Sequence, residues 1–236
     1  MTDLLFRDAY ARACETEVVA VTPEGGIVPA ASVFYPTGGG QPGDCGMLSW
    51  DGGAAEVVTT VKALDGLALV LAEGADAPTV GTKVNMELDW ATRHRFMRVH
   101  TALHLLSVVI PLPVTGGSIG ADKGRLDFNM PDALEDKDAL ERELLEFIAR
   151  DLPVTEDWIT DAALAANPGL VKTMSVKPPT GQGRVRLIRI GAGEAEVDLQ
   201  PCGGTHVART GEIGQVRLGK VEKKGRQNRR VSLHLI

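Results

Sequence analysis

Hydrophobic positions along the first 88 residues fall in short β-rich stretches with turn residues between them, a pattern that predicts strands. The β-rich runs, separated mostly by Gly or Pro, cover residues 17–22, 26–33, 54–64, 67–72 and 83–88. The letters PEGG at residues 23–26 lie between the first two runs and indicate a hairpin. Residues 1–88 are therefore predicted to form a small antiparallel β-domain that resembles a barrel.

The periodicity changes at residue 89. Apolar side chains then recur at three- and four-residue spacing, at Phe96, Val99, Leu103, Leu106 and Ile110. This spacing predicts an amphipathic helix over residues 90–109. Asp89 is placed to cap the start of the helix, and Pro111 ends it.

The rest of the chain mixes helices and strands. Apolar stripes predict helices over residues 133–149 and 161–166, and an irregular segment is expected over 171–183. The β-rich runs predict strands over residues 184–190, 194–199, 212–221 and 229–235. We therefore expect residues 89–236 to form a second domain with an antiparallel sheet and flanking helices, so that the fold class is α+β.

Composition narrows the class of protein. The chain has 44% hydrophobic residues and a net charge of −6, which argues against a protein that coats nucleic acid indiscriminately. Its three cysteines lie far apart and do not predict a disulfide framework. With no signal-peptide pattern and no apolar run long enough to span a membrane, we expect a cytoplasmic protein.

A candidate metal site begins inside the predicted helix 90–109. His100 and His104 are four residues apart, so on a helix they differ by only ~40° around the axis and ~6 Å along it. Both imidazoles can then reach one ion. An isolated pair of this kind is also compatible with packed or surface histidines.

A second pair strengthens the metal hypothesis. Cys202 and His206 are also four residues apart, in the glycine-containing segment PCGGTH. A thiol together with imidazoles favours zinc over calcium or magnesium, so the four residues predict a Zn²⁺ site. The alternative for this pair is a free buried cysteine beside a turn histidine. Thr101 stands where the metalloprotease pattern HExxH has its glutamate, so no general base is built into the helix.

The surrounding motifs resemble a known family. Residues 97–106 (MRVHTALHLL) and 202–207 (CGGTHV) are similar to the paired motifs of alanyl-tRNA synthetase editing domains and of their free-standing relatives, the AlaX-type trans-editing proteins. Further similar segments follow in the family's order at residues 117–118, 125–128, 209–214 and 224–230. Residues 34–44 (FYPTGGGQPGD) resemble the glycine-rich motif of the family members that carry an N-terminal domain.

The resemblance implies a fold and an activity. The fold is an N-terminal β-barrel-like domain followed by an α+β zinc domain, shared with threonyl-tRNA synthetase editing regions. The activity is hydrolysis of the ester that joins a wrong amino acid to alanine tRNA; that amino acid is serine and, in some members, glycine. No aminoacylation module lies within these 236 residues, so action in trans is expected. The expected partner is mischarged alanine tRNA, with neither DNA nor a membrane.

The resemblance also implies roles for individual residues. His100, His104, Cys202 and His206 match the zinc ligands. Gly38, Gly39, Gly40 and Gln41 match the motif that discriminates serine from alanine. The residues leave open whether zinc polarises the carbonyl, activates water or orients the ribose. They also leave open whether Asp44 or Asp198 is a general base or an acid at a turn or strand edge.

A basic run near the end of the chain is a candidate tRNA contact. Its members lie within eleven residues of an otherwise acidic protein: Lys220, Lys223, Lys224, Arg226, Arg229 and Arg230. Such a run is often only a solvated face. Arg93, Arg95 and Arg98 form a second, weaker candidate.

Two other functions remain compatible with the residues. One is a zinc-stabilised RNA-binding module without catalysis, and the other is a zinc hydrolase that acts on a small ester or amide. The glycine-rich segment with Gln41 and the basic run together favour the deacylase, because a small-ester hydrolase needs no RNA contact.

Overall fold

The computed structural model describes residues 2–64, 66–132, 136–174 and 183–236. The chain divides into two compact units, Met1–His94 and Arg95–Ile236, which we describe one at a time. Within the described residues, no helix is both long and apolar enough to cross a membrane.

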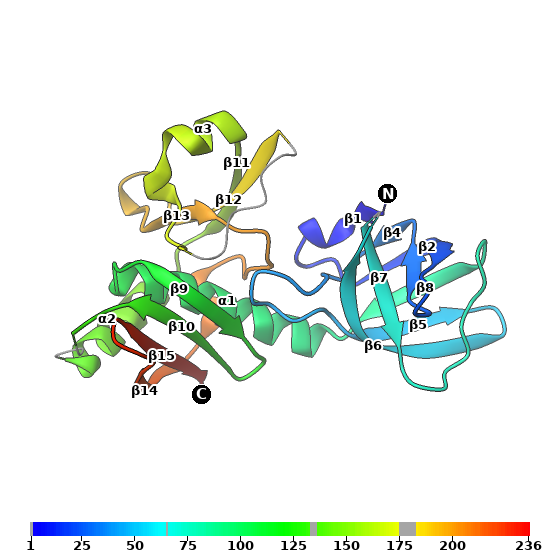
Figure 1. Ribbon diagram of the computed structural model, residues 1–236, viewed down its shortest axis with the longest axis horizontal. Helices are drawn as coiled ribbons and strands as arrows, with labels where there is room; N and C mark the ends of the chain where they lie inside the picture. Colours follow the sequence, from blue (N-terminus) through cyan, green and yellow to red (C-terminus); the bar gives the residue numbers. More distant parts are fainter. Residues whose placement is uncertain (1, 65, 133–135, 175–182) are drawn as a thin grey trace. The chain divides into compact units, whose positions relative to one another are not determined.

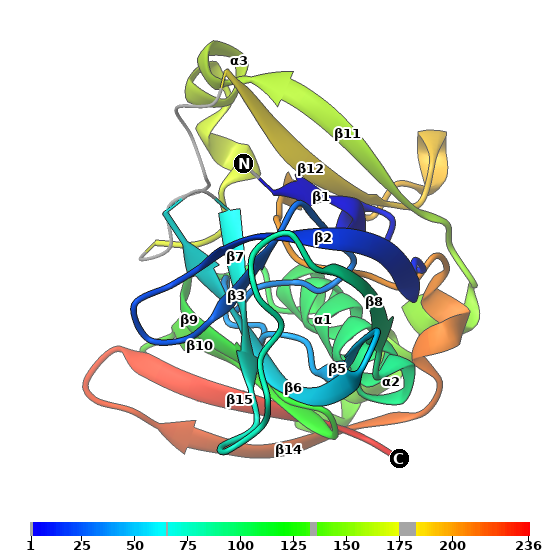
Figure 2. The same ribbon diagram turned by 90° about the vertical axis from the view of Figure 1, so that its right-hand side faces the viewer.

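The first unit is a closed antiparallel barrel, which confirms the predicted architecture (Figure 2). Its strands, in order around the barrel, are β2 (Ala13–Val21), β3 (Ile27–Pro29), β7 (Gly66–Leu71), β6 (Gly53–Ala63), β5 (Gly46–Trp50) and β8 (Lys83–Leu88). β8 pairs back onto β2 and so closes the ring. The hairpin predicted at residues 23–26 joins β2 to β3, where Val21 faces Ile27.

Alternation of apolar and polar residues fills the inside of the barrel. In β8 the side chains of Val84, Met86 and Leu88 are buried in the core while their neighbours are exposed. This is the period of two that a strand with one buried face requires. Two short elements, β1 (Asp3–Leu4) and the 3-10 helix η1 (Leu5–Arg7), precede the barrel, and β1 pairs in parallel with β4 (Ala31–Ser32).

The second unit contains two antiparallel sheets. The larger has the order β14 (Val216–Lys223), β15 (Asn228–Leu235), β10 (Lys123–Asn129) and β9 (Val114–Ile119). The smaller has the order β11 (Val154–Thr160), β12 (Arg184–Ile190) and β13 (Asp198–Pro201). The helices are α1 (Trp90–Val109), which begins in the first unit, α2 (Lys137–Ala149) and α3 (Asp161–Ala166). Short 3-10 helices complete it: η2 (Pro168–Leu170), η3 (Gly193–Ala195) and η4 (Thr210–Ile213).

The part of α1 in the second unit lies between the two sheets in both views (Figures 1 and 2). On one side it packs closely on β10, because a side chain at Gly124 would lie 2.6 Å from Val99 and 2.8 Å from Leu103. From Val99 to Leu106 every residue of α1 is buried. The predicted amphipathic character is therefore wrong for this half of the helix, since a helix covered on both sides has no solvent face.

Several predicted boundaries differ from the structure. The helix predicted to begin at residue 133 begins at Lys137, where the Asp136 side chain accepts a hydrogen bond from the Ala139 amide. Residues 133–135, and 175–182 of the expected irregular segment, lie outside the described residues. The predicted strands 194–199 and 212–221 begin later than expected, because a 3-10 turn, η3 or η4, occupies their first residues. The sequence patterns did not predict β5, β9, β10 or β11.

Candidate metal centre

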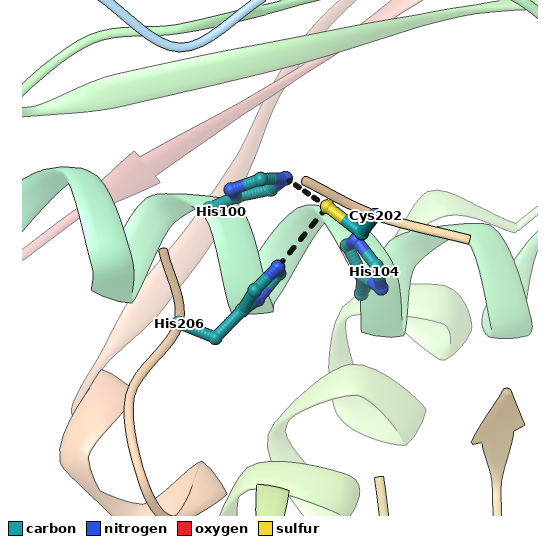
Figure 3. Close-up of side chains that lie close together, drawn as sticks. All are labelled: His100, His104, Cys202 and His206. Carbon is teal, nitrogen blue, oxygen red and sulfur yellow. Dashed lines mark hydrogen bonds between the residues drawn. The ribbon is translucent and has the colours of Figure 1, made fainter. Parts of the chain in front are cut away.

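Four side chains from two distant segments converge in the second unit. His100 and His104 lie on one face of α1, and Cys202 and His206 lie on the segment that follows β13 (Figure 3). One ligand atom from each residue lies within 4.8 Å of the others. The structure thus brings together all four residues of the predicted metal site.

The distances within this cluster suit a tetrahedral zinc ion. The Cys202 Sγ lies 3.4 Å from the His100 Nε2 and 3.3 Å from the His206 Nε2, the two contacts drawn in Figure 3. Zn–N bonds of about 2.0–2.1 Å and Zn–S bonds of about 2.3 Å place such ligands roughly 3.5 Å apart in a tetrahedron. The three imidazole rings are buried, with centroids 4.1 to 5.2 Å apart. The donor set and its spacing therefore fit zinc.

The backbone around Cys202 is held by Arg186 of β12. The Arg186 Nη1 donates to the carbonyl oxygens of Cys202 at 3.2 Å and Gly204 at 2.8 Å. The Gly204 amide in turn lies 3.5 Å from the Cys202 Sγ, a contact that favours a thiolate. Arg186 thus fixes the turn that presents the sulfur.

The rings of two histidines have hydrogen-bond partners behind them. The Thr101 Oγ1 lies 3.1 Å from the His206 Nδ1, and the Asp198 Oδ2 lies 3.0 Å from the His104 Nδ1. Asp198 is buried, and its other oxygen accepts from the Lys172 Nζ at 2.6 Å. Because both of its oxygens are engaged, Asp198 is not a free general base.

Sequence reasoning did not find these contacts of Thr101, Asp198, Lys172 and Arg186. The available signal was weak: Asp198 and Gln200 alternate on the strand that leads to Cys202, so both point to the same side. Asp198 is 94 residues from His104 along the chain, and Thr101 is 105 residues from His206. No local sequence pattern can predict contacts over such separations.

The cluster displaces the pKa values of its own members. Burial raises the pKa of the Cys202 thiol, but the charges of His100 and His206 outweigh burial and hold this pKa well below its ordinary value. Burial lowers the pKa of His206, and the neighbouring His100 lowers it further. Burial also lowers the pKa of His104, yet hydrogen bonds to Asp198 and Cys202 raise it to about 9. A thiolate and a neutral His206 are the forms that bind a metal.

The glycine-rich segment lies in the first unit and forms a tight turn. Gly38 and Gln41 exchange backbone hydrogen bonds of 3.0 and 2.9 Å. Gly39 and Gly40, which lie between them, have φ values of +58° and +84°, and residues other than glycine rarely adopt such values. Gln41 is buried. The segment is therefore a formed turn, and its conformation requires these two glycines.

A buried ion pair closes the base of this turn. The Asp44 amide donates to the Tyr35 carbonyl at 2.9 Å, and the Asp44 Oδ2 accepts from the Tyr35 amide at 2.5 Å. The fully buried Arg93 binds the Asp44 carboxylate and donates to the carbonyl oxygen of Val33 at 2.8 Å. Burial raises the pKa of Asp44, and Arg93 opposes that rise. Asp44 is thus a structural acid at a turn.

One of the three arginines of α1 that form the second basic candidate is buried. The expectation that Arg93 contacts tRNA is wrong, because its side chain has no exposed surface. Arg95 is exposed and pairs with Asp122, and the Arg98 Nε donates to the Ile213 carbonyl at 2.9 Å. These contacts engage all three arginines within the protein.

The basic run lies on the hairpin of β14 and β15. Lys220, Lys223, Lys224 and Arg226 are exposed. Arg229 donates to the carbonyl oxygens of Pro131 and Asp132, and Arg230 binds the Asp127 carboxylate. Burial raises the pKa of that carboxyl, but Arg230 and Arg125 outweigh burial and hold the pKa below its ordinary value. The run therefore splits into an exposed part and a part attached to β10 and the segment after it.

Comparison with known proteins adds the family. Residues 185–232 match the family model of the threonyl and alanyl tRNA synthetase second additional domain, and residues 9–92 match that of class II (A) tRNA synthetases. The chain is 34% identical over 231 residues to the alanine–tRNA ligase of Pyrobaculum calidifontis. This match covers 94% of the chain and 25% of the ligase. The chain thus spans about a quarter of the length of the ligases it matches.

Shorter relatives match from end to end. The chain is 32% identical over 246 residues to the alanyl-tRNA editing protein AlaX-M of Methanosarcina barkeri, and the match covers 100% of both proteins. The AlaX-M protein of Methanosarcina acetivorans is also 32% identical, over 249 residues and all of both chains. The barrel, the second unit with its histidine and cysteine cluster, and these full-length matches lead to one assignment: the chain belongs to the AlaX-M family of alanyl-tRNA editing proteins.

Proposed function

We propose that this protein is a zinc-dependent aminoacyl-tRNA deacylase that acts in trans on mischarged alanine tRNA. It hydrolyses the ester that joins serine or glycine to alanine tRNA, and it releases the free amino acid and the tRNA. The observation that carries the proposal is the match over the full length of proteins named alanyl-tRNA editing proteins, with a metal-binding cluster inside the matched region. The proposed place of action is the cytoplasm, where alanine tRNA is charged.

His100, His104, Cys202 and His206 would hold the zinc ion. When bound, zinc supplies a Lewis acid beside the reacting ester. The protein's own contribution is to hold the ligands in a buried setting, with the Cys202 turn tied down by Arg186. An aminoacyl ester is already activated, so the deacylase needs less assistance than a protease does.

Selection of serine over alanine is assigned to the turn with Gly39, Gly40 and Gln41. A buried amide side chain offers one acceptor and two donors, which suits recognition of a small hydroxyl group. A site built to pair with that hydroxyl discriminates against alanine, because its polar groups are left unpaired. Gln41→Ala is therefore expected to weaken the preference for serine more than it weakens tRNA binding.

Contact with the tRNA backbone is assigned to the exposed part of the β14–β15 hairpin, with the members Lys220, Lys223, Lys224 and Arg226. Arg229 and Arg230 support it by attaching the hairpin to the protein. Affinity should then fall as salt rises, and the slope of log affinity against log salt should shrink by about 0.7–0.9 for each contact removed. A titration of Lys223→Ala against salt measures this slope.

A second function is favoured by one observation, the number of ligands. Four protein side chains complete a tetrahedral site, and closed sites of that kind are usually structural. The competing function is a zinc-stabilised RNA-binding module that does not hydrolyse its ligand.

Deacylation assays separate the two functions. Alanine tRNA charged with serine, glycine or alanine is incubated with the zinc-loaded protein, and the release of labelled amino acid is followed. We expect rapid loss of serine and glycine and retention of alanine. Tight tRNA binding with no release from any of the three substrates would establish the RNA-binding module instead.

The ligand set is tested by substitution of its cysteine. Cys202→Ala removes the only sulfur of the cluster, so zinc content and serine release should both fall by at least tenfold. Cys14→Ala is the matched control, because Cys14 is a free cysteine of the barrel unit. Zinc content measured by atomic absorption that is equal in both variants would contradict the assignment.

A further inference from the structure

We propose that Thr101 and Asp198 are positioning residues that hold His206 and His104 with a proton on Nδ1, so that both rings present Nε2 to the metal ion. The two residues lie behind the rings on different elements, Thr101 on α1 and Asp198 on β13. This inference rests on the proposed ligands and not on the proposed reaction.

The hydrogen bonds of Thr101 fix the proton on His206. The Thr101 Oγ1 has three neighbours: the Met97 carbonyl at 3.0 Å, the Val207 amide at 3.3 Å and the His206 Nδ1 at 3.1 Å. A hydroxyl has one proton to donate and two lone pairs that accept. The Met97 carbonyl can only accept, so it takes the proton of Thr101. The His206 Nδ1 must then be a donor, and Nε2 on the opposite side keeps its lone pair.

The surroundings of Asp198 fix the proton on His104. An ionised carboxylate can only accept, so the His104 Nδ1 at 3.0 Å is the donor. Asp198 is oriented by the Lys172 Nζ on one oxygen at 2.6 Å and by the Gln200 Nε2 on the other at 2.8 Å. Gln200 also reaches the Ser107 Oγ at 3.3 Å. The carboxylate is therefore held from the strand side while it holds the ring on the helix side.

The two contacts cross between the segments that supply the ligands. Thr101 follows the helix ligand His100 and orients the ring of His206, which belongs to the distant segment. Asp198 precedes Cys202 and orients the ring of His104, which belongs to the helix. Each segment thus positions a ligand of the other, which preorganises the site before an ion binds. Loss of such outer contacts typically costs about 10- to 100-fold in metal affinity.

Thr101→Val and Thr101→Ser form a matched pair for the first half of the proposal. Valine keeps the branched shape without the hydroxyl, and serine keeps the hydroxyl. Zinc affinity is measured by competition with a chelator, and the protonated ring nitrogen of His206 is read from long-range ¹H–¹⁵N correlations in the zinc-loaded protein. We expect Thr101→Val to lose at least about tenfold in affinity and the slowly exchanging Nδ1 proton, and Thr101→Ser to keep both.

Asp198→Leu and Lys172→Met form the pair for the second half. Leucine removes the acceptor behind His104, whereas Lys172→Met changes the local charge but leaves the carboxylate in place. We expect Asp198→Leu to lose more zinc affinity than Lys172→Met, and only Asp198→Leu to lose the His104 Nδ1 proton signal. Far-ultraviolet circular dichroism verifies the fold of each variant. Should Asp198→Leu not fold, Asp198→Asn replaces it, with a smaller expected loss because the amide oxygen still accepts.

The outcomes distinguish this inference from the proposed ligands. A wild-type protein that binds no zinc would overturn the ligand set, and the positioning roles with it. A wild-type protein that binds zinc, together with Thr101→Val and Asp198→Leu variants of unchanged affinity and unchanged ring protons, would overturn the positioning roles alone. Neither measurement depends on tRNA hydrolysis.

Discussion

The turn formed by residues 36–43 in the barrel unit and the segment 202–206 in the second unit are held in different ways. The barrel turn is closed by backbone pairing of Tyr35 with Asp44 and by the ion pair of Asp44 with Arg93. In the segment 202–206, by contrast, a thiol and an imidazole meet two further imidazoles within 4.8 Å. The first arrangement is completed by atoms of the protein, whereas the second gathers four ligand atoms that could hold a metal ion.

This difference has an energetic consequence. A buried carboxylate with an arginine and an amide donor is already compensated in charge and hydrogen bonding. A cluster of three imidazoles and a thiol gathers ligand atoms whose lone pairs converge, and the free energy of metal binding then contributes to folding. We therefore expect the barrel turn to be independent of zinc and the segment 202–206 to depend on it.

Removal of zinc should give the largest effect and separate the two regions directly. The amide of Gly204 contacts the Cys202 Sγ, and the amide of Gln41 donates to the Gly38 carbonyl. After treatment with a chelator, hydrogen exchange at Gly204 should accelerate by at least about a hundredfold, because the thiolate no longer has its ion. Exchange at Gln41 should not change. Equal acceleration at both amides, measured by NMR, would contradict the expectation that only the segment 202–206 depends on zinc.

Arg93→Met should destabilise the barrel turn without affecting the metal site. The substitution leaves Asp44 buried without its partner, so the free energy of unfolding should fall by about 3–5 kcal/mol. The double variant Arg93→Met with Asp44→Leu removes both charges and should recover much of this loss. Urea titrations of the zinc-loaded proteins provide the free energies. A loss of zinc affinity in Arg93→Met as large as in Cys202→Ala would contradict the separation.

Glycines in the two regions should differ in their tolerance of alanine. A Cβ at Gly43 would lie 2.0 Å from the Thr60 carbonyl oxygen, whereas a Cβ at Gly203 would have no atom within 4 Å. Gly43→Ala should cost about 1–3 kcal/mol through overpacking. Gly203→Ala should stay within about 0.5 kcal/mol of the wild type. Urea titrations that show equal losses would mean that the metal segment is as closely packed as the barrel turn.

In both regions the sequence predicted local features but not the contacts between distant residues. Short β-rich runs between turn residues predicted most of the barrel strands, and spacing of four residues predicted the side chains that the structure brings together at the candidate metal site. Both signals are local. The ion pair of Arg93 with Asp44 spans 49 residues, and the contact of Asp198 with His104 spans 94. Such pairings follow from the packing of distant elements, so no periodicity could predict them.

The start of β13 and the whole of β9 and β10 were not predicted, for a related reason. Residues 194–199 are β-rich, yet the chain makes the 3-10 turn η3 before β13 begins at Asp198. Strand β9 contains Gly116 and Gly117, which weaken its sequence pattern as a strand. Packing of β10 against α1, together with its pairing to β15 and β9, determines these strands, and propensity alone does not.

Proton release on zinc binding should be the smallest effect, and it concerns the metal cluster and not the barrel turn. Burial lowers the pKa of His104, but hydrogen bonds to Asp198 and Cys202 raise it to about 9, so the metal-free ring is protonated at pH 7. Zinc must displace that proton, and affinity should therefore weaken by about tenfold for each pH unit below 9. Calorimetry in buffers of different ionisation enthalpy counts the protons. Asp198→Asn removes the charge that raises the pKa, so fewer protons should leave at pH 7; an unchanged count would show that Asp198 does not set the protonation of His104.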